Sequence, residues 1–351
     1  MFRCGGKRVG IGVDLKIVFG LMGGLALFLY GMNTMSAALQ RVAGERMKRI
    51  LAMVTGNPLL GALAGMVVTA VLQSSSATTV MVIGFVSAGL MTLPQAISVI
   101  FGANIGTTMT AQLMAFKLSD YIYPIIFAGF LVHFLGRRPK VKDGGLALLS
   151  FGLLFEGIDI MGSVMKPLAA DPLFTELMGE VADAPVLGVA LGMVMTLVVQ
   201  SSSATIAVLQ NVASQAGPDG ASVMGLAGAL PILLGDNIGT TITALLACIG
   251  QSRNAWRTAA AHSVFNISGT MVFLLILPVF AQAAAFLSPE GAETAVIARQ
   301  IANAHTLFNL VCTVIWLPLV PVMVKIVTTL VPAGNRGKAA RKERAILTAQ
   351  E

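Results

Sequence analysis

Long apolar stretches, separated by short polar or charged segments, recur from one end of the chain to the other. The longest stretch without Asp, Glu, Lys or Arg is residues 50–116. Because about 20 consecutive apolar residues form a helix that crosses a bilayer, this pattern predicts an all-α polytopic membrane protein. The expected full spans are residues 17–38, 94–116, 121–136, 146–165, 222–250, 258–285 and 300–326.

Composition and charge agree with this fold class. The chain is 56% hydrophobic and 11% charged, whereas a soluble domain has about 25% charged residues. The net charge of +7 comes from short basic clusters between the apolar stretches. Such clusters follow the positive-inside rule and argue against nucleic-acid binding. We expect a multi-pass protein of the cell (inner) membrane.

The chain contains an internal repeat. Residues 65–79 are GMVVTAVLQSSSATT and residues 192–206 are GMVMTLVVQSSSATI, with 11 of 15 positions identical at an offset of 127. Further on, residues 102–111 (GANIGTTMTA) match residues 235–244 (GDNIGTTITA) at 8 of 10 positions. A fainter match aligns Gly31 with Gly157. A duplication of the whole unit is therefore expected.

Charge near the repeats indicates their orientation. After the first predicted span comes a basic loop, residues 41–49, and after the matching span of the second half comes an acidic loop, residues 171–183. Equivalent loops that face opposite sides of the membrane define an inverted-topology repeat. The expected organisation is a basic tail (1–16), repeat 1 (17–143), repeat 2 (144–285), a final transmembrane region (286–332) and a basic tail (333–351).

The two QSSS segments are predicted to lie at the tips of re-entrant helical hairpins, about residues 57–92 and 186–214. Residues 58–72 would form about 22 Å of helix, less than the ~30 Å of a bilayer core. Polar backbone at membrane depth is tolerated where it lines a cavity, and helix N-termini favour anions. The alternative is that the serines only form hydrogen bonds between helices.

The two NIGTT segments are predicted to break their helices. Asn, Thr and unwound carbonyl oxygens would then form a site for a small hard cation such as sodium. The alternative is that the glycine allows two helices to pack closely. No Cys or acidic residues occur at the spacing of a transition-metal site.

Ionisable residues inside the spans are further candidates. Asp236 stands where the first half has Ala103, and an intramembrane carboxylate is a functional candidate; a helix cap is the alternative. Glu156 and Asp159 are three apart and share a helix face, which suits either a proton or cation role or bonding between helices.

A smaller echo joins AHSVFN (261–266) and AHTLFN (304–309). His262 and Asn266, like His305 and Asn309, share a helix face. A metal or proton-relay role and hydrogen bonding between helices are both open, and the second is favoured.

With both QSSS and both GxNIGTT segments, residues 18–325 resemble the type II sodium–phosphate cotransporter family, most closely its short bacterial members. The resemblance implies sodium-coupled symport of inorganic phosphate by alternating access, with no enzyme activity and no cofactor besides sodium as coupling ion. The phosphate-binding residues implied are Ser74, Ser75, Ser76, Ser201, Ser202, Ser203, Asn104 and Asn237. The sodium-binding residues implied are Gln73, Gln200, Thr107, Thr108, Thr240 and Thr241, and Asp236 joins this set as the intramembrane carboxylate described above.

Other functions remain open at this point. The substrate could be another small oxyanion or a carboxylate, coupled to sodium or protons, and a non-transporting phosphate sensor could use the same site. A serine hydrolase is disfavoured because the chain has no G-x-S-x-G turn. A homo-oligomer and a separate phosphate-regulatory protein are partners that the resemblance allows.

Overall fold

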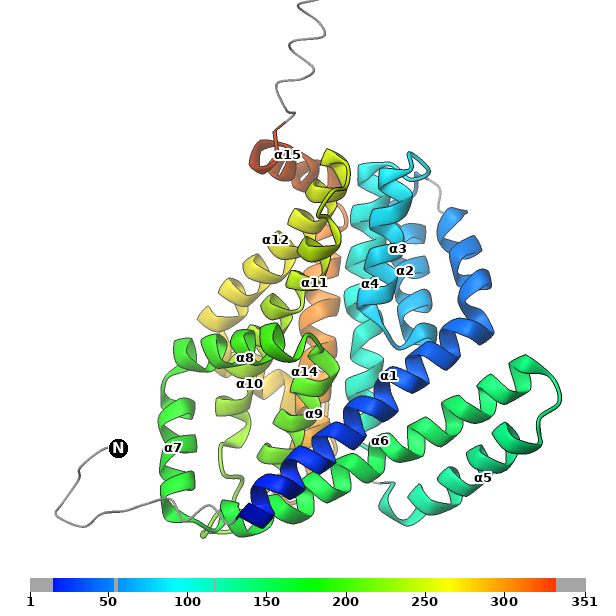
Figure 1. Cartoon of the computed structure of the whole chain (residues 1–351). Coiled ribbons are helices and arrows are strands. Elements are labelled where there is room, and N and C mark those ends of the chain that lie inside the picture. Colours follow the sequence, from blue (N-terminus) through cyan, green and yellow to red (C-terminus); the bar gives the residue numbers. More distant parts are fainter. Residues whose placement is uncertain (1–14, 54–55, 117, 333–351) are drawn as a thin grey trace, which may run out of the picture.

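A computed structural model describes residues 15–53, 56–116 and 118–332. The expected basic tails at 1–16 and 333–351 therefore lie almost wholly outside the described residues. The described chain is mostly helical, with fifteen α-helices and one short 3-10 helix (Figure 1). The helices are α1 (Leu15–Ala52), α2 (Pro58–Leu72), α3 (Ser75–Ser87), α4 (Leu93–Met114), α5 (Ile122–Leu135), α6 (Pro139–Ala169), α7 (Pro172–Asp183), α8 (Pro185–Val199), α9 (Ser202–Ala213), α10 (Gly225–Gly239), α11 (Thr241–Ala247), α12 (Arg253–Leu275), α13 (Leu277–Phe286), α14 (Glu293–Trp316) and α15 (Val320–Leu330).

The helix lengths confirm a polytopic membrane protein. In the described part, four helical segments are long and apolar enough to cross a bilayer, namely α1, α6, α10 with α11, and α12. Three bent pairs raise the number to as many as seven if each pair is one span. The two helices that flank each QSSS segment are shorter: α2 and α8 have 15 residues, α3 has 13 and α9 has 12.

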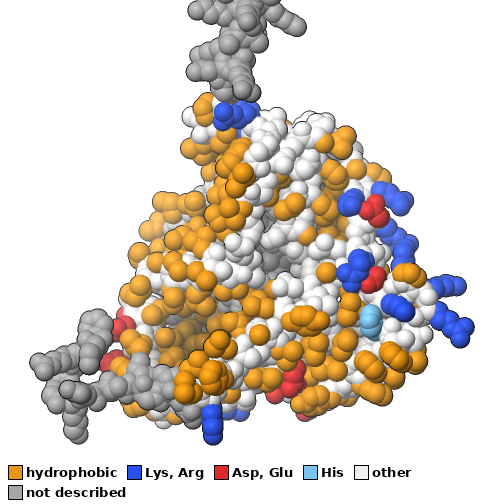
Figure 2. Space-filling view, viewed as in Figure 1, with side chains coloured by type: hydrophobic (Ala, Val, Ile, Leu, Met, Phe, Trp, Pro, Cys, Tyr) orange, Lys and Arg blue, Asp and Glu red, His pale blue; other side chains and the backbone are white. Residues whose placement is uncertain are grey.

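One layer of the molecule consists of α1, α5 and α6, which lie side by side (Figure 1). Small residues let α1 approach α6 closely: a Cβ on Gly31 would lie 2.7 Å from the Ser150 carbonyl, and a Cβ on Gly157 would lie 2.6 Å from the Gly24 carbonyl. The remaining helices form a larger body beside this layer. Hydrophobic side chains cover much of the visible surface, and Lys and Arg gather over the ends of α1, α5 and α6 (Figure 2).

Two helix pairs, α2 with α4 and α8 with α10, pack backbone against backbone. A Cβ on Gly102 would collide with the Ala62 carbonyl oxygen, and a Cβ on Gly235 would collide with the Val189 carbonyl oxygen. These contacts are equivalent in the two repeats. They fix each QSSS segment against the helix that contains the NIGTT segment of the same repeat.

The predicted break at NIGTT is wrong for the first repeat. Helix α4 runs without interruption through Gly106, which approaches the Met66 carbonyl of α2. The physical reason is the alternative use of glycine, which is close helix packing. In the second repeat the helix changes from α10 to α11 at Thr240, and the Thr240 N–H still bonds to the Asp236 carbonyl.

The prediction that residues 41–49 and 171–183 form loops is also wrong. Residues 41–49 belong to α1, which at 38 residues is longer than a bilayer is thick. The acidic segment forms α7, capped by the Asp171 side chain on the Leu173 N–H. Exposed helix faces accept charge as readily as loops do, so charge alone could not separate the two.

Candidate substrate site

Each QSSS segment begins with a glutamine in an unusual backbone conformation. Gln73 has φ 52° and Gln200 has φ 55°, and in the described part of the chain they are the non-glycine residues with positive φ. A left-handed residue ends a helix, and outside glycine it is uncommon enough to suggest a functional site. The glutamines therefore end α2 and α8 at the same point of each repeat.

The serine that follows starts the next helix. Ser74 Oγ accepts a hydrogen bond from the Ala77 N–H at 3.2 Å, and Ser201 Oγ accepts one from the Ala204 N–H at 3.3 Å. Both serines are N-caps, of α3 and α9. One of the three serines in each motif thus has a structural task, and the other two stand in the first turn of a helix.

The two motifs, 127 residues apart, meet in one cavity of about 150 Å³. The N-termini of α3 and α9 both begin at this cavity, so the positive ends of two helix dipoles lie beside the same space. Free backbone N–H groups and hydroxyls at such a place suit a small anion. The lining residues are Met32, Asn33, Ser36, Gln73, Ser74, Ser75, Ser76, Gln200, Ser201, Ser202 and Ser203.

Three of these lining residues, all from α1, were missed by the sequence reasoning. Ser36 Oγ donates to the Leu72 carbonyl at 3.0 Å and so joins α1 to the end of α2. Ser201 Oγ lies 3.7 Å from Met32 Sδ. A signal was available, because Asn33 and Ser36 are polar residues three apart in an apolar helix and share a face.

Two threonines outside the predicted set contact the first hairpin. Thr110 Oγ1 donates to Gln73 Oε1 at 3.0 Å, and Ser76 Oγ lies 3.4 Å from Thr243 Oγ1. The Gln73 amide nitrogen also donates to the Ala70 carbonyl at 2.5 Å. Thr110 and Thr243 are the last threonines of the two GTTxT sequences, two residues beyond each NIGTT segment. The repeated sequence therefore contained a signal for them.

Behind each tip lies a buried threonine pair. Thr69 bonds to Thr78 at 2.9 Å and Thr196 bonds to Thr205 at 3.0 Å. In the second repeat Asp236 joins the pair, accepting from Thr196 at 2.5 Å.

Asp236 itself lies within α10 and is fully buried, so it is not a helix cap. Its second oxygen, Oδ2, has no hydrogen-bond partner among the described residues. An ionised carboxylate in such surroundings needs a partner. A bound cation or a proton would satisfy it.

The two asparagines of NIGTT do not line the cavity. Asn104 Oδ1 lies 2.9 Å from His262 Nε2, and Asn237 Oδ1 lies 3.2 Å from His305 Nε2. All four side chains are buried. Hydrogen bonding between helices, favoured for the AHxxFN echo, is therefore what the structure contains.

Helices α12 and α14, which contain His262 and His305, each form a further hydrogen bond to the NIGTT helix of the other pair. Thr270 of α12 donates to the Leu234 carbonyl of α10 at 3.1 Å, and Thr313 of α14 donates to the Phe101 carbonyl of α4 at 3.2 Å. Helices α12 and α14 thus each contact both NIGTT helices. They join the two repeats at the centre of the molecule.

The four threonines of NIGTT bond to carbonyls of their own helices. Thr107 donates to Ala103 at 3.1 Å and Thr240 to Asp236 at 2.9 Å. Thr108 and Thr241 donate three residues back, both at 2.8 Å. None of the four lines the serine cavity, and their part in sodium binding stays a prediction.

The acidic pair of α6 lies elsewhere. Tyr123 donates to Glu156 at 3.4 Å and Ser119 donates to Asp159 at 3.2 Å, both in exposed positions. Among the described residues no group of three His, Cys, Asp or Glu could hold a metal ion.

The family model for the Na+/Pi-cotransporter matches the chain twice in succession, at residues 27–163 and 161–308. The chain belongs to this family. Membership places it among transmembrane phosphate transporters rather than enzymes. The two matches also confirm the duplication expected from the QSSS and NIGTT segments, and they meet near residue 162, inside α6.

Individual relatives agree with this assignment. The protein YqeW of Bacillus subtilis is 35% identical over 77% of this chain and 85% of its own length. YjbB of Escherichia coli, named for inorganic phosphate export, is 26% identical over 79% of this chain, which spans half of that relative. Human sodium-dependent phosphate transport protein 2B is 38% identical over 32% of this chain and 17% of its own length. No solved structure matches the chain.

Proposed function

We propose that this protein is a secondary active transporter that moves inorganic phosphate together with sodium across the cell membrane by alternating access. The observation that supports this most is that two QSSS tips from related repeats line one polar cavity. A site at the interface of two repeats is the usual place for the substrate of such transporters.

Charge compensation supports the coupling to a cation. The cavity lining includes no Lys, Arg or His, so a dianion such as hydrogen phosphate would meet only helix N-termini, hydroxyls and amides. Those groups offset part of the charge. Cations that travel with the anion would offset the rest, which is a physical reason for symport.

The proposed division of residues follows the same logic. Hydroxyl and amide donors bind phosphate, and oxygen acceptors bind sodium. The phosphate set is Ser74, Ser75, Ser76, Ser201, Ser202 and Ser203, which line the cavity, whereas a phosphate contact of Asn104 and Asn237, which lie outside the lining, stays a prediction. The sodium set is Gln73, Gln200, Thr107, Thr108, Thr240, Thr241 and Asp236. Asp236 is supported by its unpartnered oxygen.

Two features of the proposal can vary without changing the site. Protons could replace sodium at Asp236, and net transport could run outward, as the name of YjbB states for that relative. The membrane that we propose for this protein is the inner membrane.

The test is uptake of radiolabelled phosphate into proteoliposomes, with and without an inward sodium gradient. We expect sodium-dependent uptake that arsenate inhibits. Ser75→Ala combined with Ser202→Ala should remove it, because both side chains line the cavity without a capping bond. Ser163→Ala, on α6 and outside the cavity lining, is the control. Uptake indifferent to every cation gradient would overturn the symport.

A further inference from the structure

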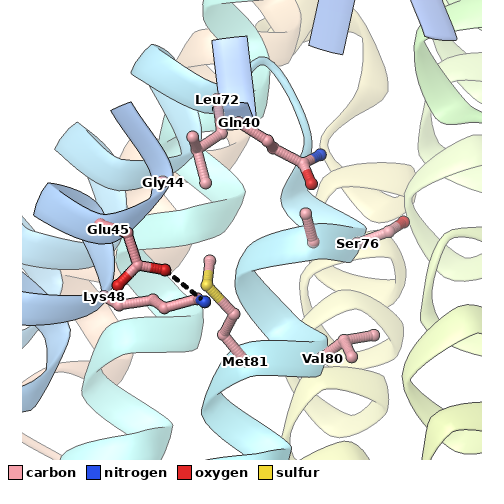
Figure 3. A pocket seen from close by; sticks show the side chains of 9 residues that line it. Gln40, Gly44, Glu45, Lys48, Leu72, Ser76, Val80 and Met81 are labelled. Carbon is pink, nitrogen blue, oxygen red and sulfur yellow. Dashed lines mark hydrogen bonds and ion pairs between the residues drawn. The ribbon is translucent and has the colours of Figure 1, made fainter. Parts of the chain in front are cut away.

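A second cavity of about 420 Å³ lies between α1 and α3 (Figure 3). Its volume compares with a share of about 30 Å³ per water molecule in the liquid, so it can hold an anion with water around it. Ser76 lines this cavity and the serine cavity alike. The lining residues are Gln40, Gly44, Glu45, Lys48, Leu72, Ser76, Ala77, Val80 and Met81.

Lys48 and Glu45 are the charged residues of this lining, and they face the α3 side chains across it (Figure 3). Lys48 Nζ donates to Glu45 Oε1 at 2.8 Å, one turn apart on α1. The side chains are 52% and 79% exposed. Water and dissolved salt screen an exposed ion pair of this kind, so a dianion can replace the carboxylate on the ammonium.

The other walls are mainly apolar. Leu72, Val80 and Met81 line the same cavity as the ion pair and lower the local dielectric. A charge interaction is stronger beside such walls than in open water. An anion bound at Lys48 therefore lies in the cavity that shares Ser76 with the serine cavity.

We propose that this cavity is an antechamber for a phosphate-type oxyanion, in which Lys48 exchanges Glu45 for the incoming anion and presents it to Ser76. This inference rests on the proposed function. It adds a capture site, outside the QSSS cavity, that sets how much phosphate reaches the serines. Two sources supply this chemistry, free inorganic phosphate and the headgroup of an anionic lipid.

The first test compares three variants of α1 in phosphate transport at low ionic strength. Lys48→Gln should raise the KM for phosphate ~10-fold, the change expected for a charge-assisted hydrogen bond, with Vmax little changed. Glu45→Gln should lower KM because it frees Lys48. Arg46→Gln is the matched control, since Arg46 is an exposed cation of α1 outside the lining. Equal KM values for Lys48→Gln and Arg46→Gln overturn the inference.

The second test does not depend on transport. Ala77→Cys in a Cys4→Ser background places a thiol in the antechamber, while Cys248 and Cys312 are buried. Inorganic phosphate should slow its reaction with a charged methanethiosulfonate reagent. Adding Lys48→Gln should abolish that protection.

The two tests separate the proposals. Phosphate protection in vesicles of neutral lipid supports capture of free phosphate. If anionic lipid slows the reaction of the thiol and added phosphate does not, the cavity is a lipid contact and the antechamber is overturned. Normal sodium-dependent uptake with no protection removes the antechamber alone. Protection without any uptake keeps the antechamber and removes the transport function.

Discussion

The tips of the two hairpins have the same sequence and the same backbone, yet different surroundings. Val80 of α3 is 49% exposed, whereas Ala207, its counterpart in α9, is 2% exposed. Ser203 and Ala204 are buried, while Ser76 and Ala77 are only partly buried. The two helices also have different neighbours, since α9 packs against α14, α6 and α4, and α3 packs against α12 and α11. The asymmetry concerns the helix after each tip, with α3 more exposed than α9.

A second difference belongs to the sequence itself. Behind the first tip the Thr69–Thr78 pair stands alone, and behind the second the Thr196–Thr205 pair is joined by Asp236. A conformational change can exchange exposure between hairpins, but it cannot exchange Asp236 for Ala103. The two repeats are therefore equivalent in shape and unequal in chemistry.

The largest effect is expected where the repeats are most alike. Gly102→Ala and Gly235→Ala should each cost about 3 kcal/mol or more, because the new Cβ would meet a backbone carbonyl that cannot rotate away. Melting temperature of the detergent-purified protein measures this. The control is Gly84→Ala, where a Cβ meets nothing within 4 Å; it should leave stability equal or raise it by about 0.5–1 kcal/mol.

The next effect separates the hairpins by accessibility. With Cys4→Ser as background, Ser76→Cys should react with a water-soluble thiol reagent ~10-fold or more faster than Ser203→Cys, since thiol reactivity follows exposure. Sodium with phosphate should narrow the ratio if the hairpins exchange exposure. Equal rates in the absence of substrate would contradict the asymmetry described above.

The chemical difference between the repeats is tested by removing the negative charge of Asp236. Asp236→Asn keeps the size of the side chain and a hydrogen bond to Thr196 but removes the charge. Interactions of charged groups are worth about 1.5–3 kcal/mol, so the sodium concentration for half-maximal uptake should rise ~10-fold or more. An unchanged sodium dependence, in folded protein, would leave Asp236 a structural role.

The smallest effect on stability concerns the two glutamines. Gln73→Ala and Gln200→Ala should both stop transport, but they should differ in stability. Gln73 makes two side-chain hydrogen bonds, worth about 1 kcal/mol each, while the Gln200 side chain makes none with the described residues. Only Gln73→Ala should lower the melting temperature. Wild-type transport in both variants would remove the glutamines from the site.

Much of this architecture could be predicted from the sequence. Two long matches in the same order predicted the duplication, and polar residues between short apolar segments predicted helix pairs with a tip at Gln73 and Gln200. What could not be predicted was what the tips would face. The contribution of Asn33 and Ser36 depends on how α1 lies against the hairpins, and nothing local to a helix specifies its neighbour.

The error at NIGTT has a similar cause. A glycine beside polar residues can bend a helix or let another backbone approach, and both uses leave the same local pattern. Gly106 serves the second use because Met66 lies opposite, 40 residues earlier in the chain. The information that decides between the two uses is held by the partner helix.

The helices α12 and α14 have a consequence for how the chain could be divided. His262, which bonds to Asn104 of the first repeat, stands far downstream in the second half of the polypeptide. A gene cut between α5 and α6 would give a leading fragment without the histidine helix that its own Asn104 requires. Separately expressed halves cut there should reassemble only as a complementing pair, never as two copies of the leading half.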